Sequence, residues 1–155
     1  MANTLPTPEA ENIVALFIDA VASGIVADNW YAEAREVAVS LGKEYGYSTE
    51  VAAGVIAAVS PMNSWGANVN LAGRILAAAG QLASGYMKVG LSKANRIIAG
   101  EAPLEVLISD KVSNFYRCIV SAGADGVCID RHAYDIAVNT RHTDATRPGL
   151  KGKRY

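Results

Sequence analysis

The chain has 155 residues, of which 51% are hydrophobic and 19% charged, and its formal net charge is -1. This length is enough for one domain with its own core, and the composition excludes a disordered chain. The near-neutral charge also excludes a general electrostatic attraction to DNA or to anionic membranes. A contact with DNA would therefore have to come from a local patch.

The sequence carries no feature of an exported or membrane-bound protein. Its two cysteines, Cys118 and Cys128, do not form a C-x-x-C pair, which favours free thiols in a reducing compartment. The first twelve residues lack the basic and apolar regions of a signal peptide. The longest apolar stretch, Val51 to Val59, is too short to span a bilayer. We therefore expect a cytoplasmic protein with no membrane partner.

The first two predicted elements are helices with recognisable ends. Thr7-Pro8-Glu9 has a capping hydroxyl, a proline and an acid, which together are typical of a helix start, and Gly24 ends this helix. A second helix is predicted from about Asp28 to Tyr45, with Gly46 as its C-cap.

The next two predicted helices are separated by a proline-containing turn. Ser48 starts a helix that is apolar nearly all round, reads "VAAGVIAAVS" and stops at Pro61. A helix without a polar face is typical of the centre of a fold. Asn63-Ser64 can cap a fourth helix that begins near Trp65 and runs to Gly80.

The remaining apolar periodicity predicts two short helices, one longer helix and a last short one, over residues 90–100, 102–108, 109–123 and 131–139. No alternating strand pattern of useful length occurs. The sequence therefore predicts an all-α protein, a compact bundle of seven or eight short helices over residues 1–139. Residues 140–155 form a polar, basic tail.

Asp130 and Lys111 are the two positions with the clearest chemical meaning. Asp130 ends an apolar run and precedes a helix, so free backbone N–H groups and the helix dipole favour its anionic form. Lys111 lies in the first turn of a predicted helix, where the dipole favours a neutral, nucleophilic amine and Asp110 opposes this effect. Such a pair can attack a glycosidic carbon, where positive charge develops. The alternative is an ordinary helix cap and a solvated lysine.

The turn at residues 60–64 is a second candidate site. Because one helix ends and another begins there, we expect it to expose Met62, Asn63 and Trp65, with Ser64 between them, at a helix N-terminus. Such a place suits a phosphate or a nucleobase. The alternative is a capped helix with Trp65 folded into the core.

His132 lies two residues after Asp130 and can either orient a substrate or be a satisfied, half-buried histidine. Cys128 and His132 are four residues apart, but no further ligand is placed to complete a metal site. We therefore expect no metal and no cofactor.

Two stretches resemble the helix-hairpin-helix DNA glycosylase superfamily of base-excision repair. "VAAGVIAAVSPMNSWGANVNLAGRIL" is similar to an early segment of that family, in which an apolar helix ends in a serine-containing turn. "DKVSNFYRCIVSAGADGVCIDRHAYDIA" is similar to its catalytic segment, in which a lysine-bearing helix leads to a V-D-x-H-like motif. Lys111 and Asp130 are 130 − 111 = 19 positions apart, as in the 8-oxoguanine branch. The resemblance covers roughly residues 51 to 138 and extends to phage and actinobacterial proteins with an I-D-R-H-A core.

The resemblance implies a DNA-glycosylase-like fold, shortened after its last helix, and a DNA or nucleotide substrate. Asp130 would stabilise an oxocarbenium-like state, and Lys111 would match the lysine that forms a Schiff base. The turn around Asn63 would approach DNA and help to fill the gap left by a flipped base. Arg131 and His132, beside the aspartate, are expected to contact the substrate.

Three alternatives to a glycosylase stay open. The family has a Gly-x-Gly turn before the lysine, but this chain has Leu107-Ile108-Ser109-Asp110 there. This departure favours a non-catalytic, phage-type protein on the same fold that binds a nucleic acid or a protein partner. A related branch resembles phage enzymes that hypermodify thymine in DNA, and such a protein would work in the cytoplasm of a bacterial host. The third alternative is a plain helical module. The sequence leaves the oligomeric state open.

Overall fold

The computed structural model describes residues 6–24, 29–82 and 84–143, and this part of the chain contains eight helices and no strand. The prediction of an all-α fold is confirmed. Contacts divide the chain into two units, each considered by itself. The central unit is Asn29–Cys128, and the terminal unit combines Met1–Asp28 with Ile129–Tyr155. Residues 144–155 of the predicted basic tail lie outside the described residues.

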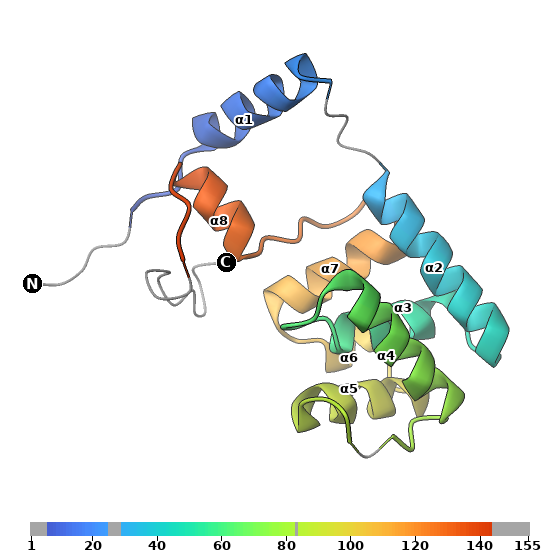
Figure 1. The fold of residues 1–155 in the computed structure, drawn as a ribbon. Helices are drawn as coiled ribbons and strands as arrows, with labels where there is room; N and C mark the ends of the chain where they lie inside the picture. The colour runs from blue at the N-terminus through green and yellow to red at the C-terminus, as the bar shows by residue number, and fades with distance from the viewer. Residues whose placement is uncertain (1–5, 25–28, 83, 144–155) are drawn as a thin grey trace, which may run out of the picture. The chain divides into compact units, whose positions relative to one another are not determined.

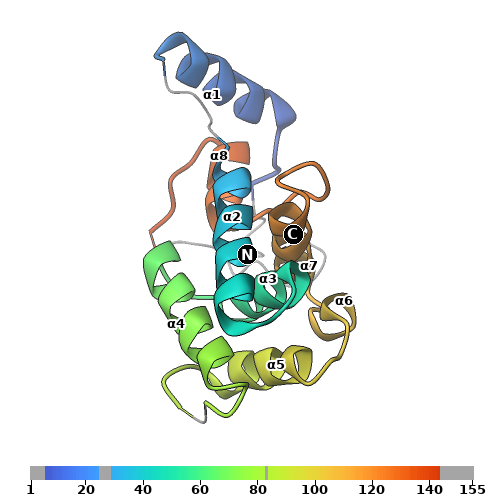
Figure 2. The ribbon, with the colours of Figure 1, turned by 90° about the vertical axis from the view of Figure 1, so that its right-hand side faces the viewer.

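The central unit is a group of helices around one buried helix. Its elements are α2 (Trp30–Tyr45), α3 (Thr49–Ala58), α4 (Trp65–Ala77), α5 (Lys88–Ile98), α6 (Pro103–Val106) and α7 (Asp110–Val120). Figures 1 and 2 show α2, α4, α5 and α7 around α3. Seven of the ten residues of α3 are buried, so the prediction that this helix is central is confirmed.

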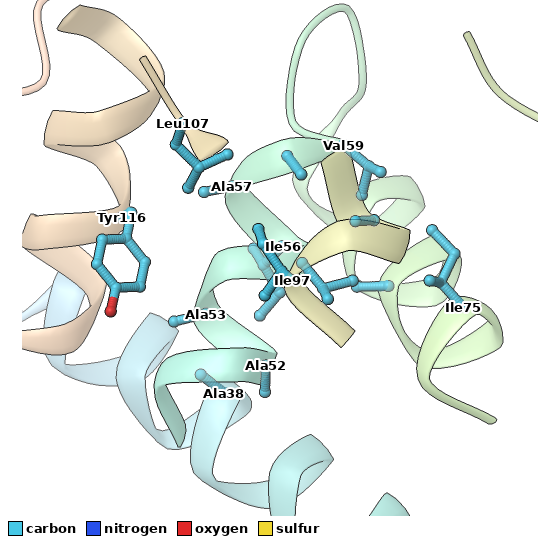
Figure 3. Close-up of a cluster of buried hydrophobic side chains, with 14 of the residues drawn as sticks. Ala38, Ala52, Ala53, Ile56, Ala57, Val59, Ile75, Ile97, Leu107 and Tyr116 are labelled. Atoms are coloured by element: carbon cyan, nitrogen blue, oxygen red, sulfur yellow. The ribbon is translucent and has the colours of Figure 1, made fainter. Parts of the chain in front are cut away.

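Small side chains allow the neighbouring helices to approach α3 closely. Ala52, Ala53 and Ala57 are fully buried, and the larger Ile56 fills the space beside Ile97 of α5 (Figure 3). A Cβ atom added to Gly54 in the same helix would lie 3.1 Å from the ring of Pro103 in α6. The alanine-rich composition of α3 is therefore a packing requirement, because close-packed interiors leave no room for larger side chains here.

The ends of these helices follow local capping rules. The Ser48 hydroxyl accepts a hydrogen bond from the backbone N–H of Val51, and the Ser64 hydroxyl accepts one from Ala67. Gly46 ends α2 with φ of 78°, a left-handed conformation that glycine adopts at little cost. The predicted helix starts at Ser48 and Ser64 and the predicted C-cap at Gly46 are all confirmed.

The terminal unit contains α1 (Ala10–Ala22) and α8 (Arg131–Ala137). No residue of α1 is buried. The predicted N-cap at Thr7 is wrong by two residues, because the N-cap is Glu9, which is extended and donates its backbone N–H to the carbonyl of Ala137, 2.8 Å away.

No helix in the described ranges is long and apolar enough to cross a membrane.

Candidate functional site

Asp130 is the N-cap of α8. Its Oδ1 atom accepts hydrogen bonds from the backbone N–H groups of His132 and Ala133, at 2.8 and 3.0 Å. The interpretation of Asp130 as a helix cap is therefore confirmed. The same two bonds fix the carboxylate, while its Oδ2 atom accepts no hydrogen bond from the described residues of the terminal unit. The cap is thus compatible with a further role for the acid, and that role stays a prediction.

Arg131 and His132 follow in the first turn of α8, and both are exposed. The side chain of His132 lines a pocket in the terminal unit together with Asp135 of the same helix. His132 therefore faces space that a ligand can fill, while its contact with a substrate stays a prediction.

Lys111 lies in the first turn of α7, as predicted, and is half-buried. Its backbone carbonyl accepts a hydrogen bond from the thiol of Cys128, 3.5 Å away. Lys111 belongs to the central unit and Asp130 to the terminal unit, so neither unit by itself contains both. Asp130 follows Cys128 by two residues in the chain.

Four aromatic side chains gather in the central unit, and we call them the aromatic group: Trp30, Tyr31, Trp65 and Phe115. The ring of Trp30 lies 4.9 Å from Trp65, 5.0 Å from Tyr31 and 6.0 Å from Phe115, where the two planes are stacked at 29°. Trp30 is 40% exposed, and Trp65 and Phe115 are half-buried. The group thus combines an apolar interior with a solvent-facing indole. It was missed in the sequence because its members come from the starts of two helices and the middle of a third.

Lys111 and Phe115 are four residues apart in α7 and therefore lie on the same face of this helix. This spacing puts the lysine one turn from the aromatic group. A lysine one helical turn from a pair of stacked aromatic rings is a suitable surrounding for a planar base.

The turn at residues 60–64 is held by side-chain bonds. The Asn63 amide donates to the carbonyl of Val59 at 2.8 Å, the Ser60 hydroxyl donates to Ala57 at 3.0 Å, and the Tyr86 hydroxyl donates to Pro61. At its tip, Met62 has a φ of 63° and is 87% exposed. The expected exposure of Met62 is confirmed. The expected exposure of Asn63 is wrong, because its amide is used to close the end of α3 and the residue is half-buried.

A second apolar tip lies in the turn between α6 and α7. Leu107 is fully buried beside Ala57 (Figure 3), whereas Ile108 is 80% exposed. Ala57 is near the C-terminal end of α3, from which the turn at 60–64 continues, so both apolar tips belong to the same end of α3. Leu107 and Ser109 have φ of −91° and −86°, so neither position requires a glycine.

Tyr31 connects the aromatic group to the segment that leads to Asp130. Burial, followed by the neighbouring thiols of Cys128 and Cys118, raises the pKa of the Tyr31 hydroxyl well above its usual value. The Cys118 thiol also donates to the carbonyl of Gly126, 3.3 Å away. Neither cysteine forms a disulfide with another described residue. Hydrogen bonds from the two thiols therefore hold the segment at residues 126–128 against α7.

Within the described part of the chain, no group of three or more histidine, cysteine or acidic side chains is arranged to hold a metal ion.

These features define an all-helical protein with an aromatic group next to a lysine at a helix start. The chain belongs to DUF7178, a family of unknown function whose model matches residues 2–155. The match therefore covers both units. No curated protein and no solved structure matches the chain.

Proposed function

We propose that the protein is a DNA glycosylase-like enzyme that acts on a nucleobase through its N-glycosidic bond. The observation that carries this proposal is the position of Lys111, half-buried in the first turn of α7 and one turn from Phe115 and the rest of the aromatic group. A nucleophile and a stacking surface for a base are thereby offered by one face of one helix.

The chemistry of Lys111 follows from its place in the helix. Lys111 presents a primary amine from the first turn of α7. A neutral amine can attack the C1′ atom of a deoxyribose and displace the base, which takes up the proton that the amine loses. Opening of the C1′–O4′ bond then leaves a Schiff base on the sugar. The stacked rings of Trp30 and Phe115 would hold the base once it is out of the duplex.

Asp130 supplies the negative charge that this reaction needs. The transition state at C1′ carries positive charge, which a fixed carboxylate stabilises. The two hydrogen bonds from α8 hold the Asp130 side chain in one orientation. Arg131 and His132, both exposed beside it, would contact the sugar or the phosphates.

The exposed apolar tips support a contact with DNA. Apolar side chains such as Met and Ile are used as wedges that unstack a base step and help to extrude a nucleotide. Met62 and Ile108 are suited to this role because both are exposed at the same end of α3. Asn63 and Ser64 would then shape the turn that presents the wedge, rather than read the DNA themselves.

The test is base release from duplex and single-stranded oligonucleotides that carry a panel of normal, damaged and modified bases. Alkali cleaves the strand at each abasic site, so release appears as strand scission. We expect release by the wild type, loss of release in Asp130→Asn, and retention in Asp125→Asn, which removes the same charge from an exposed position. Equal release by wild type and Asp130→Asn would contradict the proposed role of Asp130.

A second candidate is a non-catalytic protein that binds DNA or a protein partner. It is favoured by Asp110, an exposed acid in the first turn of α7, where the related family presents glycine amides to phosphate. This candidate predicts binding of an oligonucleotide or of a partner protein without release of any base. A thymine-hypermodifying enzyme would instead change the mass of the base and leave the strand resistant to alkali.

A further inference from the structure

The terminal unit contains a pocket of about 400 Å³, and His132 is the one lining residue to which the proposed reaction gives a role. Three parts of this unit contribute to it: α1, one face of α8 and the segment that follows α8. The lining residues are Asn12, Leu16, His132, Asp135, Ile136, Asn139, Thr140 and Arg141.

A buried pair of side chains builds one wall of the pocket. The backbone N–H of His142 donates to Oδ2 of Asp135 at 3.3 Å, and its Nδ1 atom lies 2.9 Å from Oδ1. These two contacts fold the segment after α8 back onto the helix. Thr140 and Arg141, which lie between the two residues, are thereby placed at the pocket.

The pair is costly to bury. The side chains of Asp135 and His142 are 9% and 11% exposed, and the burial of polar side chains costs free energy that their hydrogen bonds must offset. The terminal unit has few buried apolar groups to offset this, because α1 buries none of its residues. The pair therefore serves to position the segment at 139–141 more than to stabilise the unit.

A further hydrogen bond fixes the opposite wall. The Asn12 amide of α1 donates to the carbonyl of Ala137 at 2.8 Å. Leu16 lies one turn further along α1 and supplies an apolar surface, as does Ile136 of α8. The pocket is thus held between two helices by polar contacts at its rim.

Hydrogen-bond donors dominate the polar lining. Arg141 brings a permanent positive charge, His132 adds an imidazole, and Asn12 and Asn139 add amide groups. Asp135 is the one acid among the described lining residues, and both of its oxygens are already in contact with His142. The pocket therefore offers a positive charge and several donors to a ligand, which suits an anionic group.

The size of the pocket indicates more than an inorganic ion. Its volume is in the range of sites for small organic ligands, and Leu16 and Ile136 can cover an apolar or planar body. We infer that the pocket binds a small organic phosphate of the size of a nucleoside monophosphate. The phosphate would lie against Arg141 and His132. This inference rests on the pocket alone and is independent of base release.

Calorimetric titration of the full chain tests the inference, with thymidine monophosphate, thymidine and inorganic phosphate as probes. We expect the monophosphate to bind at least tenfold more tightly than thymidine, because a charge-assisted bond to Arg141 contributes about a factor of ten or more. Arg141→Gln should raise the Kd for the monophosphate by about tenfold. Arg96→Gln removes the same charge from the central unit and should leave the Kd unchanged.

The variant His142→Ala tests whether binding of the monophosphate requires Arg141 to be held in position at the pocket. It keeps the arginine but releases the segment that carries it, so the monophosphate should bind more weakly while the helical circular dichroism is retained. The inference is overturned if no binding of the monophosphate is detected at concentrations up to the millimolar range. It is equally overturned if thymidine binds as tightly, or if Arg141→Gln binds like the wild type.

Discussion

Different interactions stabilise the two units of this chain, each taken by itself. The central unit is built around an apolar helix, α3, whose residues Ala52–Ala58 are all buried. The described residues of the terminal unit form no such core: α1 buries none of its residues, and α8 buries Tyr134, Asp135 and Ala137. Its two helices are joined by hydrogen bonds to backbone carbonyls instead. We therefore expect the central unit to have the larger free energy of unfolding. The terminal unit has fewer buried apolar side chains among its described residues, and side-chain hydrogen bonds position its polar groups.

A matched pair of substitutions gives the largest expected contrast. Ile56→Ala removes a fully buried side chain of α3 and should cost about 2–5 kcal/mol of unfolding free energy. Ile18→Ala makes the same chemical change on the exposed surface of α1 and should cost about 0.5 kcal/mol or less. Urea denaturation measures both. Similar losses of unfolding free energy in the two variants would show that Ile18 is buried in solution. That result would contradict the difference between the two units.

The connection between the core and the turn at 60–64 can be tested at Gly90. A Cβ atom at this position would lie 2.3 Å from the ring of Tyr86 and 3.1 Å from the carbonyl oxygen of Ala58. Gly90→Ala should therefore cost about 1–3 kcal/mol and displace the tyrosine that bonds Pro61. Gly66→Ala is the control, since nothing lies within 4 Å of its added Cβ, and alanine should stabilise α4 by up to about 1 kcal/mol. An unchanged unfolding free energy in Gly90→Ala would show that Tyr86 does not pack closely against Gly90.

Hydrogen exchange distinguishes the units directly. We expect the amides of α3 to exchange only through global unfolding and those of α8 through local opening. His142→Ala removes a side-chain contact to Asp135 and should speed exchange in α8 by about tenfold, with no change in α3. His132→Ala, in an exposed position, serves as the matched control. Equal acceleration in α3 would mean that the units unfold together.

Alkaline pH should weaken the central unit through Tyr31. The pKa of its hydroxyl is raised above the ordinary value of 10.0 by burial and by the two nearby thiols. Above pH 10 the unfolded chain ionises at this residue while the folded chain does not, so the unfolding free energy falls as the pH rises. Tyr31→Phe should reduce this loss between pH 9 and 11 in urea titrations. Burial also raises the pKa values of Tyr86 and Tyr116, so part of the slope should persist. An unchanged slope in Tyr31→Phe would contradict the burial of this hydroxyl.

The smallest expected effect on stability is at Asp130. Asparagine also caps helices well, so Asp130→Asn should change the unfolding free energy by less than about 1 kcal/mol, whereas Asp130→Ala should cost about 1 kcal/mol. Thermal denaturation checks both. A severe loss of stability in Asp130→Asn would indicate that the charge itself holds α8 in place.

The parts of the structure that were predictable from sequence depend on neighbours along the chain. Ser48 and Ser64 as N-caps and Gly46 as a C-cap follow from rules that act within one helical turn. The central place of α3 follows from its uniformly apolar surface. Asp130 as the cap of α8 is another local feature, and it too was predictable.

The parts that could not be predicted depend on distant residues. The Asp135–His142 pair bridges the end of α8 to a segment without periodicity, and no local pattern signals it. The aromatic group needs three helices to be packed before Trp30 meets Phe115. The joint action of Lys111 and Asp130 stays a prediction, because their helices belong to different units.

Borohydride trapping tests the proposed reaction most directly, because it needs no knowledge of the base. An oligonucleotide with one abasic site presents the sugar aldehyde, an amine condenses with it as water is lost, and borohydride reduces the Schiff base to a stable covalent link. We expect a covalent complex with the wild type and with Lys88→Gln, and none with Lys111→Gln. A complex that persists in Lys111→Gln, or no complex with the wild type, would contradict the assignment of Lys111 as the nucleophile.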